Sequence, residues 1–398
     1  MERKKRILIS CLGVFDAGGI DSALVNLLNE IHDRYDVTLY VASQYVSSNF
    51  SIPDDVKILR GSDYIHDIGI IRKWQREQSL PRKILRNIRR ILRTYVFRSW
   101  VIERALDRLE VEGDYDVAIA FADYPYDEKN KKIFDFHIVE NLVRANRKIA
   151  WTHNNPEKFG WTAELCEARL SGFDAIVSVS EANRELLGNI CPKLRPKLRV
   201  VLNTYDIDGI LRKGSMVVQS FENDAKLKLT TVSRAVLDCK RLDRIVEVCS
   251  RLKADGLGGL EWKVVGGGDD LETLRAMARK SGVDGFLHFV GWTANPFPYM
   301  KQADALVLCS EYEAFGMVLR EAQILGTPVF ATDYPAAVES IINGLSGEIC
   351  PNSTDGLYAM IKSVLENPSK LIHYREYIAK HPVDNSKALA QFRAVLER

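Results

Sequence analysis

The chain has 398 residues, which is enough for two domains with complete hydrophobic cores. Hydrophobic residues make up 46% and charged residues 27%, a composition that is typical of a globular protein and excludes extensive disorder. The net charge of +2 excludes a protein that binds polyanions through its global charge.

Short apolar runs alternate with helical patterns along the chain, which is typical of βαβ units and parallel sheets. In the first half, strands are predicted at residues 7–11, 37–41, 117–121, 148–151, 175–178 and 199–202. In the second half, strands are predicted at residues 228–232, 261–265, 286–289, 305–308, 328–331 and 347–349. Helices are predicted at residues 21–31, 242–252 and 387–397, and from residue 316 onward. The pattern therefore predicts an α/β protein with two sheets of comparable size.

The alternation lapses into a polar stretch at residues 203–220, where we place the domain boundary. Each half opens with a strand, a loop and a helix, which predicts two Rossmann-like, doubly wound parallel-sheet domains facing a cleft. The first domain is expected to span residues 1–204 and the second residues 205–381. The C-terminal helix, within residues 382–398, is expected to pack back on the first domain.

Residues 72–108 combine apolar residues at helical spacing with crowded arginines, and they carry Trp74 and Trp100 near the two ends. A basic amphipathic helix with aromatic ends fits the surface of an anionic membrane. The alternatives are a solvated helix packed on its own domain and an RNA-binding segment, although no base-stacking module accompanies the arginines. We expect peripheral membrane contact and no nucleic-acid partner.

The seven cysteines are scattered and form no Cys-x-x-Cys pair, which predicts small buried side chains in a reducing compartment. The N-terminus has a basic start but lacks the apolar core and cleavage site of a signal peptide. No apolar run approaches the ~18 residues of a membrane span. These features predict a cytoplasmic protein, placed on the inner face of the membrane by residues 72–108.

Candidate site residues of the first half follow predicted strands. Gly18 and Gly19 end a glycine-containing loop before a helix, where backbone amides can approach a phosphate closely. The loop is neither the Gly-x-Gly-x-x-Gly dinucleotide fingerprint nor a Walker A loop, and such turns often serve only to pack a helix. His153 follows a strand end, and it fits a structural role as well as a catalytic one.

In the second half, Arg234 and Lys240 follow the first strand and place two cations at its carboxyl end. They could neutralise a diphosphate without a metal ion, although charged residues in such loops are often merely solvated. Gly267 lies in the glycine turn after the second strand, which on its own implies only a tight turn. No His, Asp and Glu cluster has metal-ligand spacing, so neither a metal nor another cofactor is expected.

Two carboxylates follow the strand at residues 305–308. Glu313 lies in the loop after that strand and Glu321 lies on the next helix, so both can border the crevice at the carboxyl end of a parallel strand. Carboxylates accept hydrogen bonds from vicinal hydroxyls, and the amides at a helix start bind anions. A ligand that combines a sugar with a phosphate would use both.

Residues 304–333, with Glu313, Glu321 and the run Gly-Thr-Pro-Val at 326–329, resemble the Glu-x7-Glu signature of retaining family 4 glycosyltransferases of GT-B fold. Similar blocks are residues 265–268, residues 289–292 near the nucleotide base, the pair Arg234 and Lys240, and residues 177–180 and 201–203. Ser233 and Arg241 replace family glycines, and Pro335-Ala336 resembles the variant found in bacterial capsular and exopolysaccharide transferases.

The resemblance implies a role for each matched residue. Glu321 would bind the ribose hydroxyls of the nucleotide, and Glu313 would contact hydroxyls of the transferred sugar. Arg234 and Lys240 would hold the diphosphate, and His153 would lie beside the donor sugar and the acceptor. The remaining residues of the donor site would be Phe315, Gly316, Met317 and Val318 through their amides, with Gly18, Gly19, Gly267 and Trp292.

The resemblance implies a retaining, metal-independent glycosyltransferase of polysaccharide biosynthesis, with a nucleotide-sugar donor and a lipid-linked or cell-surface glycan acceptor. A UDP-sugar is favoured, and a donor of the GDP-mannose type is the alternative. A two-domain NAD-dependent dehydrogenase is also compatible with two Rossmann-like halves, but neither half supplies its glycine fingerprint. A non-enzymatic sugar-binding protein would ordinarily be exported, for which no leader is seen.

Overall fold

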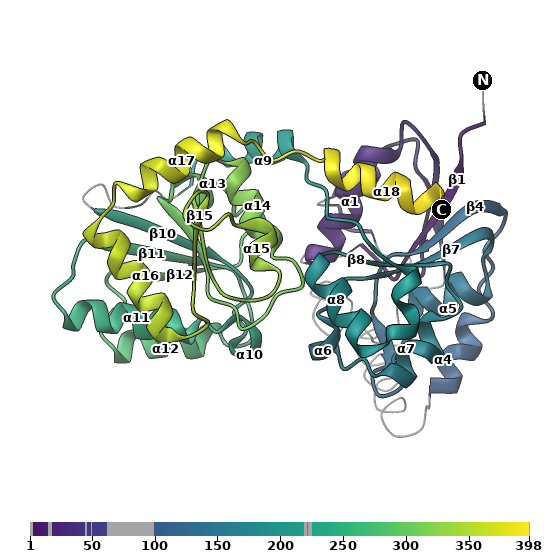
Figure 1. Cartoon of the computed structure of the whole chain (residues 1–398), viewed down its shortest axis with the longest axis horizontal. Coiled ribbons are helices and arrows are strands. Elements are labelled where there is room, and N and C mark those ends of the chain that lie inside the picture. Colours follow the sequence, from purple (N-terminus) through teal and green to yellow (C-terminus); the bar gives the residue numbers. More distant parts are fainter. Residues whose placement is uncertain are drawn as a thin grey trace, which may run out of the picture. The chain divides into compact units, whose positions relative to one another are not determined.

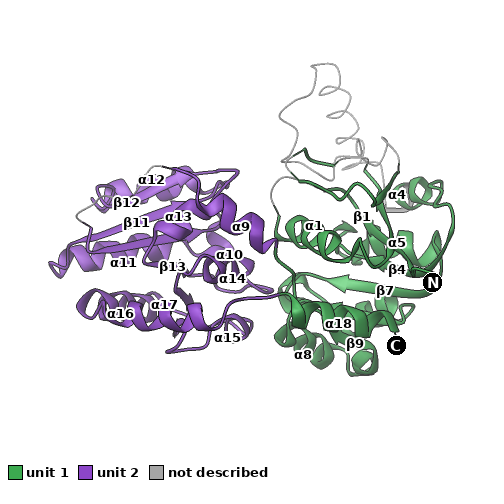
Figure 2. Cartoon of the chain, turned by 90° about the horizontal axis from the view of Figure 1, so that it is seen from above, with its two compact units in different colours: residues 1–205, 385–398 green, residues 206–384 purple. Residues whose placement is uncertain are grey.

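The computed structural model describes residues 3–14, 18–43, 46–48, 50–61, 99–218, 221 and 225–397. The chain forms two compact units, shown in Figure 1 and coloured separately in Figure 2. Unit 1 comprises residues 1–205 and 385–398, and unit 2 comprises residues 206–384. The basic segment 72–108 lies outside the described residues as far as residue 98, so its predicted membrane contact stays a prediction.

Unit 1 is built on a parallel sheet with the strand order β3-β2-β1-β4-β7-β8-β9. Its strands are β1 (Arg6–Cys11), β2 (Asp36–Val41), β3 (Lys57–Arg60), β4 (Asp114–Ala120), β7 (Arg144–Thr152), β8 (Ala175–Ser178) and β9 (Leu198–Val200). The chain winds outward from β1 in one direction and from β4 in the other. The topological switch point, where open α/β sheets bind ligands, therefore lies between the carboxyl ends of β1 and β4.

Helices cover both faces of this sheet (Figure 1). They are α1 (Gly19–Ile31), α4 (Ser99–Leu106), α5 (Phe134–Asn141), α6 (Pro156–Phe159), α7 (Ala163–Leu170) and α8 (Glu181–Ile190), followed by a 3₁₀ helix at Pro192–Lys197. A short hairpin of β5 (Pro125–Asp127) and β6 (Lys132–Ile133) lies apart from the main sheet.

The C-terminal helix α18 (Ser386–Glu397) belongs to unit 1, although it follows unit 2 in the chain. Its Phe392 is buried, with ring centroids 6.3 Å from Trp151 and 6.2 Å from Tyr35. The main-chain carbonyl of Val395 accepts a hydrogen bond from Arg147 Nε at 3.0 Å. A buried aromatic anchor thus joins the last helix to the first unit.

Unit 2 has a parallel sheet with the order β12-β11-β10-β13-β14-β15. Its strands are β10 (Leu227–Val232), β11 (Leu260–Val265), β12 (Leu287–Gly291), β13 (Ala305–Leu308), β14 (Val329–Thr332) and β15 (Gly347–Cys350). Its helices are α9 (Ile207–Gly214), α10 (Leu237–Lys240), α11 (Asp243–Ala254), α12 (Leu271–Lys280), α13 (Phe297–Gln302), α14 (Met317–Ile324), α15 (Ala337–Ser340), α16 (Thr354–Glu366) and α17 (Lys370–Lys380). The switch point lies between β10 and β13.

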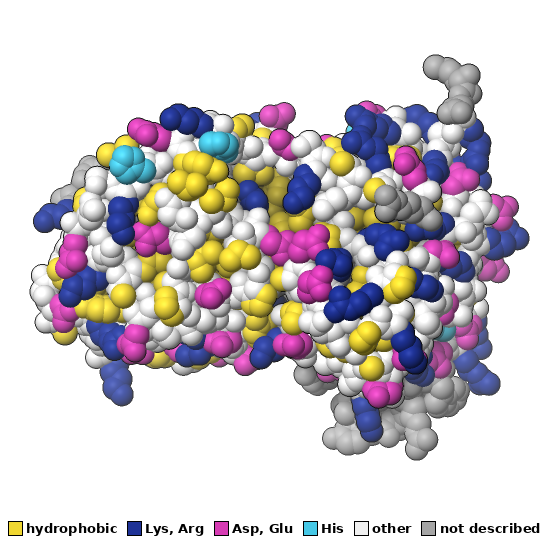
Figure 3. Space-filling model, in the orientation of Figure 1, with side chains coloured by type: hydrophobic (Ala, Val, Ile, Leu, Met, Phe, Trp, Pro, Cys, Tyr) yellow, Lys and Arg dark blue, Asp and Glu magenta, His cyan; other side chains and the backbone are white. Residues whose placement is uncertain are grey.

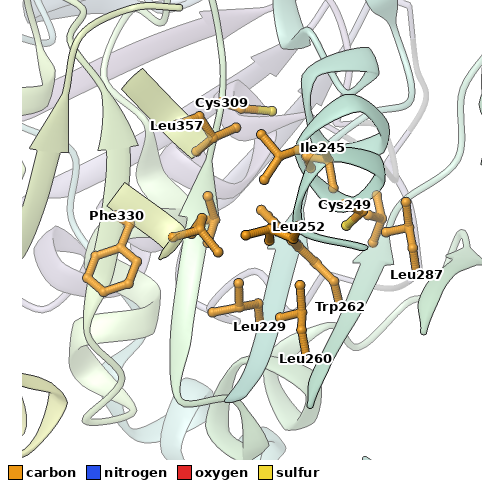
Figure 4. Packing of buried hydrophobic residues seen from close by; sticks show 14 of the residues in the cluster. Leu229, Ile245, Cys249, Leu252, Leu260, Trp262, Leu287, Cys309, Phe330 and Leu357 are labelled. Atoms are coloured by element: carbon orange, nitrogen blue, oxygen red, sulfur yellow. The ribbon is translucent and has the colours of Figure 1, made fainter. Parts of the chain in front are cut away.

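The core of unit 2 forms where α11 packs against the sheet, as Figure 4 shows. Ile245, Cys249 and Leu252 of α11 lie buried against strand residues such as Leu229 and Trp262. Because side chains alternate across a strand, one face of β10 and β11 supplies this core while the ends of the strands stay free for loops. The prediction of two doubly wound parallel sheets is confirmed, and every predicted strand is present, most of them with shifted ends.

Candidate functional site

The loops after β10 and β13 meet at the switch point of unit 2. The Glu311 main-chain N–H donates to the Cys239 carbonyl at 2.8 Å, and Cys309 Sγ donates to the Lys240 carbonyl at 3.3 Å. The one-turn helix α10 is therefore fastened to the loop that carries Glu313. This contact brings together residues far apart in the chain.

Lys240 and Glu313 form an ion pair through Nζ and Oε1. The two side chains are only 15% and 14% exposed, and Ser310 Oγ donates to the same glutamate oxygen at 2.8 Å. Ser310 is itself held, because its carbonyl accepts Thr332 Oγ1 at 2.7 Å. The structure thus places two predicted site residues in direct contact, at the point where both strands end.

Arg244 of α11 holds the loop that carries Glu313 through hydrogen bonds. Its buried guanidinium donates to Glu311 Oε2 at 2.6 Å, to Asn352 Oδ1 at 2.6 Å and to the Cys309 carbonyl at 3.2 Å. Asn352 Nδ2 returns a hydrogen bond to the Glu311 carbonyl at 3.0 Å. Arg244 was not predicted as a site residue; the signal was an arginine set between apolar residues on the buried face of a helix.

Helix α14 begins directly after Gly316, whose φ of 82° is in the left-handed region. A Cβ at this glycine would lie 2.7 Å from the Tyr334 hydroxyl oxygen, so the position requires glycine on two grounds. Phe315 is buried, which leaves backbone amides, including those of Met317 and Val318, to serve an anion at this helix start.

Tyr334 is a second residue of this region that was not predicted. It is 1% exposed, and its hydroxyl has no hydrogen-bond partner among the described residues. Burial raises the pKa of Tyr334 well above its usual range, and the charge of Glu313 raises it further. The phenol therefore stays neutral beside the Glu313 loop.

Glu321 lies on α14 and is half-buried. Burial raises the pKa of its carboxyl to about 7. Within the described part of the chain, no hydrogen bond or ion pair of its side chain is found. A desolvated carboxylate without a partner is suited to accept hydrogen bonds from ligand hydroxyls.

The exposed Arg234 lies in the loop after β10, which packs closely on the glycine turn after β11. Ala235 N donates to the Gly267 carbonyl at 3.0 Å, and a Cβ at Gly268 would lie 2.2 Å from the Ala235 carbonyl oxygen. Trp292 is 60% exposed beside this turn, with its Cβ 3.1 Å from the place of a Cβ on Gly267. The glycines are therefore needed for close packing of two loops at the edge of the site.

His153 lies at the carboxyl end of β7 in unit 1 and is 7% exposed. Its ring packs on Phe121, with centroids 4.8 Å apart, and Nε2 has no partner among the described residues. Burial lowers the pKa of His153 to about 3, and a hydrogen bond with the Phe121 backbone opposes this shift. The imidazole is therefore neutral at physiological pH.

Two buried carboxyl groups of unit 1 were not predicted. Asp123 Oδ2 accepts the main-chain N–H groups of His153 at 3.0 Å and Asn154 at 3.2 Å, while burial raises the pKa of Asp123 to about 6. Asp135 accepts Ser10 Oγ at 2.9 Å, and burial raises its pKa to about 7. The available signal for Asp123 was an acidic residue shortly after a buried strand.

Gly18 precedes α1 with an extended backbone, and Gly19 is the first residue of that helix. Residues 15–17 of the preceding loop lie outside the described residues. The predicted site residues thus fall into two groups. His153, Gly18 and Gly19 belong to unit 1, and all the others belong to unit 2.

Among the described residues, no group of three or more His, Cys, Asp or Glu side chains is arranged to hold a metal ion. No described helix has both the length and the apolar character needed to cross a bilayer.

Residues 215–381 match the family model of glycosyl transferases group 1. The glycogen synthase of Mycobacterium tuberculosis is 36% identical over 114 residues, which cover 28% of each chain. The lipopolysaccharide 1,6-galactosyltransferase of Salmonella typhimurium is 30% identical over 121 residues, which cover 28% of this chain and 34% of that protein. The matches thus span about a third or less of these relatives.

The fold of the whole chain is similar to that of Anabaena HepE in complex with UDP and glucose. The TM-score is 0.67 at 15% identity, and 99% of both chains is covered. The predicted GT-B architecture is confirmed. The comparisons give no support to the dehydrogenase alternative.

Proposed function

We propose that the protein is a retaining, metal-independent glycosyltransferase of polysaccharide biosynthesis, since residues 215–381 match the family model of glycosyl transferases group 1. Its donor is a nucleotide sugar, with UDP preferred to GDP, and its acceptor is a hydroxyl of a lipid-linked or cell-surface glycan. The observation that carries the proposal is the meeting of Lys240, Glu313 and the start of α14 at the switch point between β10 and β13.

The parts of a nucleotide sugar match the chemistry of this site. Arg234 and Lys240 stabilise the charge that develops on the leaving diphosphate, together with the first amides of α14. Glu321 accepts hydrogen bonds from the ribose, and Glu313 accepts them from the transferred sugar. On the face drawn in Figure 3, basic and acidic side chains of unit 2 lie interspersed, so anion binding depends on locally placed cations.

Retention follows from attack on the same face of the sugar that the diphosphate leaves. The acceptor hydroxyl forms the new bond to the sugar carbon as the bond to the phosphate oxygen breaks, and that oxygen takes the hydroxyl proton. No side chain is assigned as nucleophile. His153, which is neutral because its pKa is about 3, contributes a hydrogen bond through Nε2 rather than a charge.

The preference for UDP is supported by the similarity of fold to HepE, which was solved with UDP and glucose. A polysaccharide acceptor is supported by the lipopolysaccharide 1,6-galactosyltransferase among the relatives.

Hydrolysis of a panel of UDP-sugars and GDP-sugars without acceptor tests the proposal. We expect release of UDP from one donor, and a rate ~10²–10³ lower in Arg234→Ala and Lys240→Ala, by analogy with a lost oxyanion donor. Arg251→Ala is the matched control, because Arg251 is 41% exposed and pairs with Asp355 on the surface of the same unit. Full activity of the Arg234→Ala, Lys240→Ala double variant contradicts the assignment.

The proposal includes peripheral attachment to anionic lipid through residues 72–108, on the strength of their arginine-rich amphipathic pattern. We expect co-sedimentation with anionic vesicles, weakened by salt, and none with neutral vesicles. Absence of binding to both kinds of vesicle assigns the segment a structural role.

A further inference from the structure

Lys240 and Glu313 would serve different parts of the donor, yet they contact each other. Nζ of Lys240 pairs with Glu313 Oε1, and both side chains are about 85% shielded from solvent. The cation that should bind the diphosphate is thus neutralised within the protein. Any diphosphate must compete with a carboxylate for it.

The cost of that competition depends on what accompanies the diphosphate. When Lys240 turns to the phosphates, Glu313 keeps the Ser310 hydroxyl but loses its counter-charge in a shielded position. A bare nucleoside diphosphate offers nothing in return and adds negative charge nearby. A nucleotide sugar brings hydroxyl groups that donate to the carboxylate and replace the lost partner.

We propose that the Lys240–Glu313 pair makes the site prefer the nucleotide sugar over the nucleoside diphosphate, so that Glu313 determines specificity for the intact donor. The inference rests on the proposed function and deepens it. Its consequence is weaker inhibition by the product, because the departing diphosphate is the species that leaves Glu313 unpaired.

The surrounding contacts determine which partner moves. Glu313 is tied through Ser310 to Thr332, and the neighbouring Glu311 is held by the buried Arg244. The backbone of α10 is fastened through Cys239 to the same loop. The flexible four-carbon side chain of Lys240 is therefore the part that can turn toward a ligand while the rest of the site stays in place.

Calorimetric titration with UDP, GDP, UDP-glucose and GDP-mannose tests the inference on the full chain. Glu313→Gln keeps an oxygen for Ser310 but removes the charge that competes for Lys240. We expect this variant to bind the preferred nucleoside diphosphate about tenfold more tightly than the wild type and to lose most of the preference for the nucleotide sugar. Lys240→Met is expected to weaken binding of the diphosphate.

Glu348→Gln is the matched control, since Glu348 pairs with Lys370 at 3.1 Å elsewhere in unit 2 and changes the net charge equally. If the wild type binds a nucleoside diphosphate and Glu313→Gln binds it no more tightly than Glu348→Gln does, the inference is wrong while the proposed function stands. If neither the wild type nor Glu313→Gln binds any of the four nucleotides, the proposed function and the inference both fail.

Discussion

The carboxylate of Asp123 connects the end of β4 to the loop after β7 by accepting the main-chain N–H of His153 at 3.0 Å. The same oxygen accepts the N–H of Asn154 at 3.2 Å, and the second oxygen has no partner within the described residues. Asp123 is 1% exposed, and burial raises its pKa to about 6. The histidine of the proposed site is therefore positioned by a carboxyl group whose ionised form is disfavoured.

The free energy of unfolding should depend less on pH in Asp123→Asn than in the wild type. Between the ordinary pKa of aspartate and about 6, the folded chain keeps a proton that the unfolded chain has released. Stability is therefore lost as pH rises through this window, by about 3 kcal/mol for this group. Urea unfolding at pH 4 and pH 7 measures the difference.

Asp123→Leu serves as the companion to this variant, because it removes the acceptor as well as the charge. It should be less stable than Asp123→Asn at both pH values by about 1–3 kcal/mol, since two buried N–H groups lose their partner. An equal pH dependence in wild type and Asp123→Asn would show that the carboxyl is not the titrating group.

Nucleotide affinity should rise with pH through the ionisation of Glu321. Its pKa of about 7 makes the carboxyl mostly protonated at pH 6 and mostly ionised at pH 8, and the ionised form is the better acceptor for ribose hydroxyls. The affinity for UDP should increase by up to about tenfold over this range. In Glu321→Gln only the titration of the diphosphate can change the affinity with pH. An identical rise of UDP affinity in the wild type and in Glu321→Gln would rule out Glu321 as the ribose-binding group.

Gly316→Ala should cost more stability than Gly326→Ala. Both glycines have positive φ, 82° and 78°, but a Cβ at Gly326 meets nothing within 4 Å, whereas at Gly316 it meets the Tyr334 hydroxyl at 2.7 Å. Placing a side chain on a backbone with positive φ costs about 1–2 kcal/mol of stability at both positions, and the clash adds to this cost only at Gly316. Thermal unfolding compares the two variants.

Adding Tyr334→Phe to Gly316→Ala should restore part of the lost stability, because the atom in the way is the phenol oxygen. Tyr334→Phe alone should be tolerated, since the buried hydroxyl has no partner in the part of the chain that is described. If Tyr334→Phe restores no stability to Gly316→Ala, the strain lies in the backbone alone.

Phe392→Ala should destabilise unit 1 by about 3–5 kcal/mol, since it empties a buried aromatic position between Trp151 and Tyr35. Hydrogen exchange followed by mass spectrometry should locate the loss of protection in residues 1–205 and α18. Ile372→Ala on α17 is the control, because Ile372 is 59% exposed and should change little. A loss confined to unit 2 would contradict the packing of α18 on unit 1.

The strands could be predicted because each central strand of a parallel sheet is buried on both faces and therefore consists of a continuous apolar run. The edge strand β3 was missed, since its residues are half-buried or exposed and make no such run. The hairpin of β5 and β6 was also missed, because strands of only three and two residues are too short to form an apolar run.

The candidate site was predicted in part. Arg234, Lys240, Glu313 and His153 lie in the segments that follow strand ends, and Glu321 lies on the helix after such a segment; these positions are visible in the periodicity of the chain. Arg244, Asp123 and Tyr334 were missed because their importance comes from partners distant in the sequence, such as Glu311, which is 67 residues from Arg244.

The apolar periodicity of the chain determined two doubly wound sheets and the places where loops leave them, because burial of each strand is a local requirement. Only the tertiary structure decided that Lys240 pairs with Glu313, 73 residues away, and that Asp123 holds the loop of His153. The reason is the winding of each sheet, which brings the carboxyl ends of non-consecutive strands side by side at the switch point. Which charged side chains pair across the switch point depends on which residues are neighbours in space, and the linear order of residues does not specify those neighbours.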